Sequence, residues 1–148
     1  KIDRENEYIL FYSSLRNQIS KIKDQSQNLK FKTFFLPTII LDILWNRLHI
    51  MPIERLIGDV DVFISSDWVQ PPTVKAKKVT FIYDLTPLKY PEEMGSKITE
   101  THKRRLHWVK KECDIIFCDS NSAKQDIVSM LDIPESKVKV IYPGITQI

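Results

Sequence analysis

The chain has 148 residues, a length that suits one globular domain with a proper core. Its composition, 43% hydrophobic and 28% charged, is ordinary for a folded globular protein. The formal charge of +3 is too small to indicate a nucleic-acid partner, so none is expected. The sequence contains no run of about 18 apolar residues to cross a membrane and no recognisable signal peptide, so we expect a cytoplasmic protein.

Cysteine and glycine usage argues against the common metal and nucleotide sites. The spacing of Cys113 and Cys118 matches no metal motif, and both lie in or beside an apolar run. They are predicted to be buried free thiols in a reducing compartment. The three glycines, Gly58, Gly95 and Gly144, are too far apart for a GxGxxG or Walker loop. We therefore expect no metal and no cofactor in this chain.

The N-terminal third predicts two strands followed by a helix. Strands are expected over 8–12, which is apolar and aromatic, and over 29–35, which alternates. The polar segment 17–28 between them is interpreted as a loop or a weak exposed helix. Apolar residues at helical spacing then predict a helix over 37–49, and a short turn follows over 52–57.

Strands and helices alternate through the rest of the chain. Strands are predicted over 60–64, 78–83, 114–118 and 138–141, and helices over 96–112 and 123–131. A capping box of Ser122 and Gln125 is expected to begin the last helix, with an apolar face of Ala123, Ile127, Met130 and Leu131. Such alternation predicts βαβ units, and hence a Rossmann-like three-layer α/β/α fold with a mostly parallel sheet.

Polar clusters follow four of the predicted strands. They are Ser65-Ser66-Asp67, residues 83–87, residues 119–122 and Tyr142-Pro143-Gly144. Ligands of open parallel sheets bind outside the carboxyl ends of the strands, and the start of a helix there favours a phosphate. The same residues also have structural interpretations, because Ser120 and Ser122 are common helix caps and Asp84 suits a turn.

The predicted helix over 97–112 is basic. Its positive side chains are Lys97, Lys103, Arg104, Arg105, Lys110 and Lys111, against Glu100 and Glu112. A solvated basic face is the simpler interpretation. The sharper one is that Lys103, Arg104, Lys110 and Lys111 contact anionic lipid headgroups at the inner face of the membrane. Core positions are predicted for Trp45 and Trp108, a packing role for Trp68, and surface or capping roles for His49, His102 and His107.

The order of these motifs carries a resemblance. The run VTFIYDLTPLKYPEEM, a basic helix, and then CDIIFCDSNSAKQDIVSMLDIPESKVKVIYPGI resemble the N-terminal domain of family-4 (group 1) retaining glycosyltransferases. The resemblance covers about residues 60–146. It implies one half of a two-domain GT-B enzyme that transfers a hexose such as mannose from a nucleotide-diphosphate sugar to a glycan or lipid-linked acceptor.

The resemblance also implies roles for the polar clusters. The acceptor side of the cleft would be lined by Ser65, Ser66, Asp67, Tyr83, Asp84, Thr86 and Pro87, and the donor-phosphate side by Ser120, Asn121, Ser122 and Lys124. Pro143 and Gly144 would begin the interdomain hinge, and Asp84 is the one candidate for a catalytic role. Tyr83 stands where the family often has histidine. Tyrosine is a poor acid–base group at neutral pH, so we expect Tyr83 to be a contact.

The resemblance further implies that residues 1–148 form a single acceptor-side domain of a longer protein. The first strand of the fold would precede Lys1, and the donor-binding domain would follow Ile148. We expect the isolated chain not to turn over substrate. The main alternative is a non-enzymatic α/β module that binds an anionic ligand, a membrane surface or a protein partner. A phosphoacceptor receiver domain is disfavoured, because Ser13-Ser14 follow the first predicted strand instead of the paired acids that hold Mg²⁺.

Overall fold

The computed structural model describes residues 5–14 and 28–144. Within these ranges the strands form two sheets, and every strand pairing is parallel. The smaller sheet pairs β1 (Tyr8–Ser13) with β2 (Leu29–Phe34), and the larger has the order β3 (Val62–Ser65), β4 (Lys77–Phe81), β5 (Ile115–Cys118) and β6 (Val138–Val140). Every predicted strand is therefore confirmed with slightly shifted boundaries. The predicted loop over 17–28 lies outside the described residues except at its last position.

The two long predicted helices are confirmed as α5 (Ser96–Glu112) and α6 (Asn121–Leu131). The helix expected over 37–49 is divided into α1 (Thr38–Leu41) and a π-helical segment, η2 (Asp42–Arg47), and the expected turn contains α2 (Glu54–Ile57). Three short helices were not predicted: α3 (Thr86–Lys89), α4 (Pro91–Met94) and η3 (Glu135–Lys137). These are too short to display the periodicity by which a helix is recognised.

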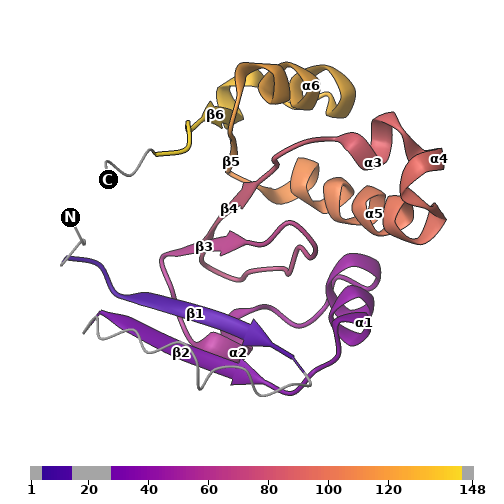
Figure 1. Ribbon diagram of the computed structural model, residues 1–148. Helices are drawn as coiled ribbons and strands as arrows, with labels where there is room; N and C mark the ends of the chain where they lie inside the picture. Colours follow the sequence, from indigo (N-terminus) through magenta and orange to yellow (C-terminus); the bar gives the residue numbers. More distant parts are fainter. Residues whose placement is uncertain (1–4, 15–27, 145–148) are drawn as a thin grey trace.

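The larger sheet is built from successive parallel crossovers. Because β4, β5 and β6 are adjacent in chain order, right-handed connections place α5 and α6 on the same face of the sheet (Figure 1). The inward side chains agree, since Ile116 of β5 belongs to one core cluster with Val109 of α5 and Ile127 of α6. The arrangement is that of a Rossmann-like α/β fold.

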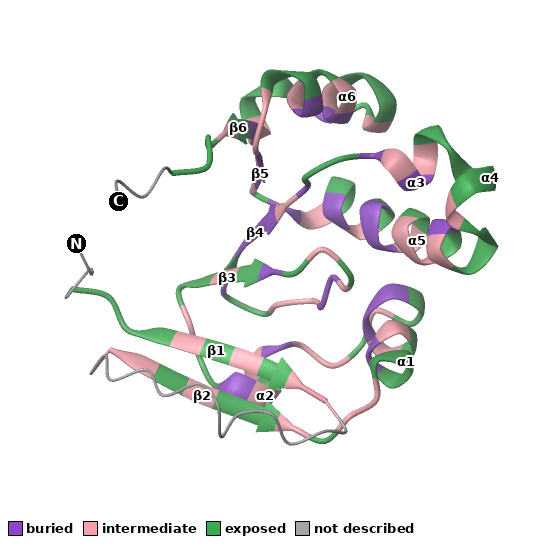
Figure 2. Ribbon diagram, in the orientation of Figure 1, coloured by how far each residue is buried: buried purple, intermediate pink, exposed green. Residues whose placement is uncertain are grey.

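Two core clusters hold the fold together (Figure 2). One lies between the larger sheet and helices α5 and α6, and it includes Cys113 and Cys118, which are free and buried as predicted. Burial raises the pKa of the Cys113 thiol to about 11, so it stays protonated and unreactive. The second cluster surrounds Trp45, which is 1% exposed, and it joins Phe11 of β1 to Phe63 of β3. The two sheets therefore share this second core.

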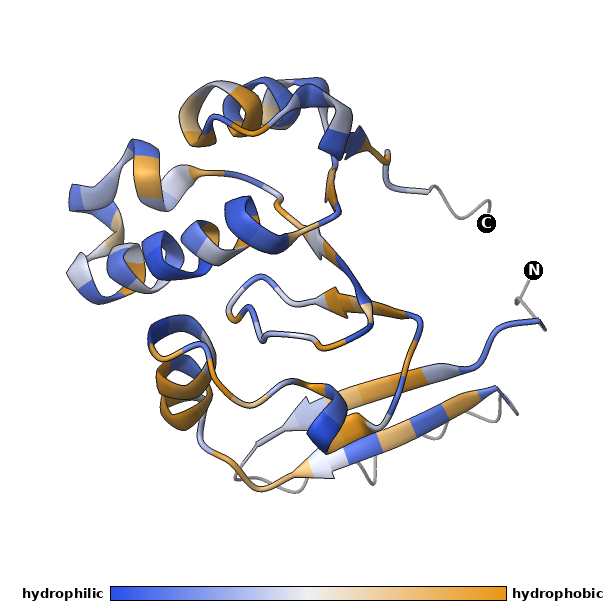
Figure 3. Cartoon of the chain, turned by 180° about the vertical axis from the view of Figure 1, so that it is seen from behind, coloured by the Kyte–Doolittle hydropathy of each residue, from blue (hydrophilic) through white to orange (hydrophobic). Residues whose placement is uncertain are grey.

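The smaller sheet follows the predicted alternation. Hydrophobic and hydrophilic residues succeed one another along β2, as Figure 3 shows. Its inward side chains are only partly buried, and on β1 the outward-facing Tyr8 and Leu10 are 47% and 48% exposed. This sheet is thus less deeply buried than β4 and β5.

The start of α6 corrects one prediction. Ser120, not Ser122, is the N-cap, and its Oγ accepts a hydrogen bond from Ala123 N at 3.1 Å. The helix therefore begins two residues before the expected position, and Ser122 is exposed inside its first turn. Met130 was also placed wrongly, because it is 42% exposed, whereas Ile127 is fully buried. The face that packs on the core consists of Ala123 and Ile127, with Val128 and Leu131 against them.

Candidate functional site

The four parallel strands bring their carboxyl ends to one edge of the larger sheet, as the sequence predicted. Ser65 ends β3, Asp84 follows β4, Ser120 follows β5, and Tyr142 follows β6. Here "the carboxyl edge" means this row of strand ends and the turns that follow them. It is the place where an open parallel sheet binds ligands.

A buried arginine organises the carboxyl edge between β3 and β4. Arg105 of α5 is 1% exposed, and its guanidinium donates to Asp67 Oδ1 at 2.8 Å. It also donates to Thr80 Oγ1 at 2.8 Å and to the Phe81 carbonyl at 2.9 Å. The prediction that Arg105 belongs to the exposed basic face of the helix is wrong. The guanidinium is buried because it gains one carboxylate and two neutral acceptors, and a buried charge requires such partners.

A hydrogen-bonded chain extends from Arg105 into the interior. Thr80 Oγ1 lies 2.8 Å from Ser65 Oγ, which in turn lies 2.6 Å from Gln70 Oε1. Gln70 N donates to Asn46 Oδ1 at 3.0 Å, so the chain reaches η2. Ser65 is 3% exposed, so it supports the edge from below rather than facing a ligand. The sequence predicted that Ser65 contacts the acceptor. Its hydroxyl instead bonds to Thr80 and Gln70 inside the protein.

Three ionisable side chains, those of Asp67, His102 and Asp84, lie close enough to influence one another near Arg105. Burial raises the pKa of Asp67, the charges of Arg105 and His102 oppose that rise, and Asp84 adds to it. Burial lowers the pKa of His102, which favours the neutral imidazole at neutral pH. Trp68 lies beside this histidine, with ring centroids 5.2 Å apart, and is 56% exposed. The edge thus presents carboxylates, a neutral imidazole and an indole together.

Sequence reasoning missed His102 and Arg105 as members of this site. His102 was interpreted as a surface or capping residue, although it lies four residues after Ile98 and four before Leu106, on the apolar stripe that the exposed His107 does not share. The available signal was the spacing of Thr101, Arg105 and Val109, four residues apart, which puts the arginine on the side of α5 that carries a core valine.

The turn after β4 has a structural role as well. Asp84 Oδ1 accepts a hydrogen bond from Thr86 N at 2.7 Å, which is the turn geometry expected for aspartate before Leu-Thr-Pro. Pro87 is buried in the first turn of α3 and does not face a cleft. Tyr83 is 52% exposed and stacks on Phe81. Of the predicted acceptor contacts, Ser66 is also exposed at the end of β3.

The residues predicted to line the donor-phosphate side of the cleft are less closely grouped than the residues around Arg105. Asn121 Nδ2 donates to Tyr142 Oη at 3.1 Å, so the ends of β5 and β6 are joined. Lys124 points to Glu135, with Nζ 2.8 Å from Oε1, and Ser120 is occupied by its capping bond. Pro143 and Gly144 are exposed at the end of the described residues, and their predicted hinge role stays a prediction. The structure therefore brings the β3–β4 residues together more tightly than these.

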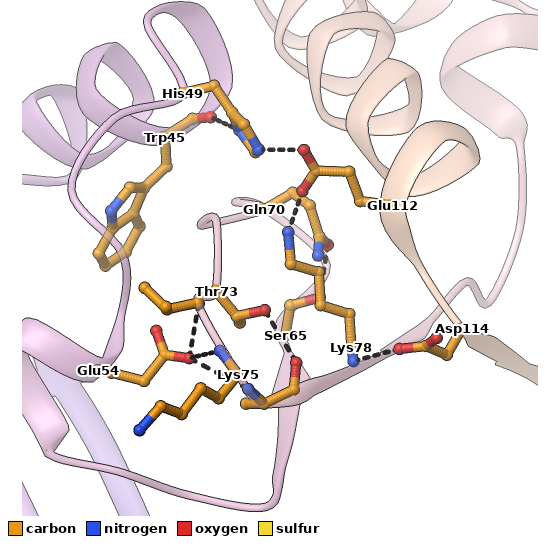
Figure 4. A network of polar contacts seen from close by, with 12 residues as sticks. Trp45, His49, Glu54, Ser65, Gln70, Thr73, Lys75, Lys78, Glu112 and Asp114 are labelled. Carbon is orange, nitrogen blue, oxygen red and sulfur yellow. Dashed lines mark hydrogen bonds and ion pairs between the residues drawn. The ribbon is translucent and has the colours of Figure 1, made fainter.

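A second polar network lies at the opposite, amino-terminal end of β4 (Figure 4). Glu112 of α5 accepts from His49 Nε2 at 2.9 Å and pairs with Lys78, which is 6% exposed. Burial raises the pKa of Glu112, but the bonds from Lys78 and His49 outweigh it and leave the pKa below its ordinary value. His49 Nδ1 also lies 2.8 Å from the Trp45 carbonyl. The network ties the end of η2 to α5 and has a structural role.

The predicted membrane-surface residues all have partners within the protein. Lys103 pairs with Glu100, Arg104 with Asp42, and Lys110 with Asp132. Lys111 Nζ lies 5.0 Å from the centre of the Trp108 ring. Except for the pair of Arg104 with Asp42, these pairs are largely exposed to solvent. They therefore reduce the positive charge of the basic face of α5 only weakly.

No family model matches the chain, and no curated protein matches it. Within the described residues, no helix is long and apolar enough to cross a membrane, and no cluster of three or more metal-binding side chains occurs.

Proposed function

We propose that this chain is the acceptor-side domain of a retaining glycosyltransferase. The whole enzyme would transfer a hexose from a nucleotide-diphosphate sugar to a glycan or lipid-linked acceptor. The proposal rests on the resemblance over residues 60–146 and, above all, on the grouping of Asp67, His102 and Trp68 at the carboxyl edge. The enzyme would work in the cytoplasm, at the inner face of the membrane when its acceptor is lipid-linked.

The chemistry of the carboxyl edge suits a sugar hydroxyl. Asp67 is held by Arg105 through one oxygen, so its other carboxylate oxygen can accept a hydrogen bond from a ligand. Neutral His102 can accept another, and the exposed indole of Trp68 offers a flat apolar surface to the C–H face of a pyranose ring. The buried links to Arg105 fix these groups before the ligand arrives, which lowers the cost of ordering them.

Transfer would make a glycosidic bond from the acceptor oxygen to the anomeric carbon and break the bond to the nucleotide diphosphate. The residues at the ends of β5 and β6 would face the donor phosphates, and Lys124 would have to exchange its ion pair with Glu135 for a phosphate oxygen. Most donor contacts would come from a second domain beyond residue 148. Stabilising the leaving diphosphate would then be shared between the two domains.

The open edges of the two sheets favour a further strand. β1 pairs only with β2, and β3 only with β4, among the described residues, yet both contact the core around Trp45. Their arrows point the same way in Figure 1. Val62 and Ile64, which are 51% and 56% exposed, lie on the face of β3 opposite that core. We propose that a further βα unit of the whole protein pairs with both edges and covers this face.

The test is turnover by the protein encoded by the complete gene. Incubation with UDP- and GDP-sugars and a set of glycan and prenyl-phosphate acceptors is expected to give transfer or slow hydrolysis from one donor. Binding to anionic liposomes with no turnover of any donor would instead favour the alternative, a non-enzymatic module that uses the basic face of α5.

A further inference from the structure

A basic hollow lies between η2 and α5, away from the carboxyl edge. It measures about 350 Å³ and is lined by Asn46, Arg47, Lys103, Arg104, His107 and Trp108. The helical segment that begins with α1 packs beside α5 in Figure 1, and η2 contacts α5 directly. Neither the resemblance nor the carboxyl-edge site assigns a role to this hollow.

The π-helical turns of η2 shape one wall. Leu48 N bonds to the Ile43 carbonyl at 2.9 Å, one residue further back than in an α-helix. This winding brings Arg47 Nε to 3.2 Å from Asp42 Oδ2, five residues earlier. Trp108 Nε1 donates to the Asn46 carbonyl at 2.9 Å and so fixes α5 against η2. The hollow is therefore held by bonds between the two elements.

Successive turns of α5 supply the other wall. Lys103, Arg104 and His107 are three and four residues apart, so they lie on one face of the helix. With Arg47 they give three permanent positive charges, and His107 adds a fourth when protonated. The carboxylates that face them are Asp42, from η2, and Glu100, from α5. The hollow therefore retains a net positive charge.

Arg104 is incompletely satisfied. Its Nη2 lies 3.4 Å from Asp42 Oδ2, a long contact, and 3.1 Å from Thr101 Oγ1. Its Nε is buried and has no hydrogen-bond partner among the residues that the structure describes. The Arg104 side chain is 27% exposed, so its guanidinium, held by the long Asp42 contact and by Thr101, can still donate to an anion in the hollow. The ring of Trp108 is already in contact with His49 and Lys111, so it offers little free surface on which the nucleobase of a nucleotide could stack.

We infer that this hollow binds a phosphate group through Arg104, Arg47 and Lys103. Guanidinium groups match phosphate oxygens in geometry and charge, and the volume admits a diphosphate. The phosphate would come from a soluble phosphate ester or from an anionic lipid headgroup. The inference does not depend on the proposed transferase activity, because the ligand is held without any transfer step.

The experiment titrates the 148-residue chain with inorganic pyrophosphate by isothermal calorimetry. In parallel, its co-sedimentation is measured with vesicles of phosphatidylglycerol in phosphatidylcholine and with phosphatidylcholine alone. Arg104→Gln and Arg47→Gln should each weaken binding about tenfold, since each removes a charge-assisted hydrogen bond. The matched control is Lys97→Gln, an exposed α5 residue outside the hollow, which should change binding by less than about twofold.

The two sources of phosphate give different results. Pyrophosphate binding that depends on Arg104, with no vesicle binding, indicates a soluble ester, whereas Arg104-dependent binding to anionic vesicles alone indicates a lipid headgroup. Equal losses in Arg104→Gln, Arg47→Gln and Lys97→Gln would overturn the inference, because only general charge would then matter. Absence of binding to either probe would overturn it too. Arg104→Lys keeps the positive charge but loses the planar guanidinium with its paired donors. This variant should bind the phosphate probe more weakly, while its thermal unfolding matches that of wild type.

Discussion

Replacing Arg105 with methionine tests whether the carboxyl edge depends on this buried charge. The change keeps an apolar stem of similar length and removes the guanidinium. Three hydrogen bonds are lost, to Asp67, Thr80 and Phe81. Asp67 is left partly buried beside Asp84 without its cation.

The expected loss follows from burial. Removing one partner of a fully buried ion pair costs about 3 to 5 kcal/mol. Asp67 is 36% exposed and partly solvated, so the lower end, about 3 kcal/mol, is expected for Arg105→Met. For a domain of this size, that lowers Tm by about 6 to 12 °C. Asp67→Asn should cost about 2 to 3 kcal/mol, because the amide oxygen can still accept from Arg105 but the buried guanidinium loses its carboxylate partner.

Urea unfolding of wild type, both single variants and the double variant completes a double-mutant cycle. A coupling of about 1 to 2 kcal/mol between Arg105 and Asp67 is expected. Lys97→Met on the exposed face of α5 is the control and should change stability by less than about 0.5 kcal/mol. A loss for Arg105→Met no larger than that of the control would refute the assignment of Arg105 to the buried site.

Further variants test the cap, the imidazole and the second polar network. Ser120→Ala should cost about 1 kcal/mol in urea unfolding and Ser122→Ala almost nothing; the reverse order would restore Ser122 as the cap. The pKa of His102 is lowered in the folded state, so its contribution to stability is complete above pH 6.5 and is lost as the pH falls below it. His102→Gln should therefore flatten the stability profile between about pH 5 and 7, and an unchanged slope would count against this assignment. Lys78→Met should lower the free energy of unfolding by about 3 kcal/mol, because Glu112 then keeps only His49 as a partner. A variant with the Tm of wild type would show that this network does not contribute to stability. The pKa of Glu112 is also lowered, so wild type should lose a further increment as the pH falls below 4.5, and Glu112→Gln should lack that increment in acid titrations.

The strands and long helices could be predicted because their apolar periodicity is local. The carboxyl edge could be predicted too, since parallel strands present their ends together: Ser65 ends β3, Asp84 follows β4 and Ser120 follows β5. The division of 37–49 into α1 and η2 could not, because the choice of a π-helical turn depends on how Asn46 and Trp108 dock.

The burial of Arg105 shows where sequence reasoning stops. A lysine- and arginine-rich helix normally exposes its charges. Spacing places Arg105 on the side of α5 that carries Val109, but the acceptors that stabilise its charge come from β4 and from the loop after β3, which the pattern of α5 does not contain. The same limit applies to Pro87 and Ser65, whose residue types suit a ligand edge but whose side chains are buried. Whether a polar residue faces a ligand or the core is decided by tertiary packing, which a strand-end pattern does not contain.

The measurement that tests the proposed function most directly is acceptor-dependent transfer by the whole enzyme carrying Trp68→Ala or Asp67→Asn. We expect KM for the acceptor to rise about tenfold in each variant, with KM for the donor unchanged, because both side chains would contact only the acceptor. Ser129→Ala, an exposed serine near the end of α6 and outside the carboxyl edge, is the matched control and should change KM for the acceptor by less than about threefold. Wild-type acceptor KM in both variants would contradict the account, since the grouped residues at the carboxyl edge would then not bind the acceptor.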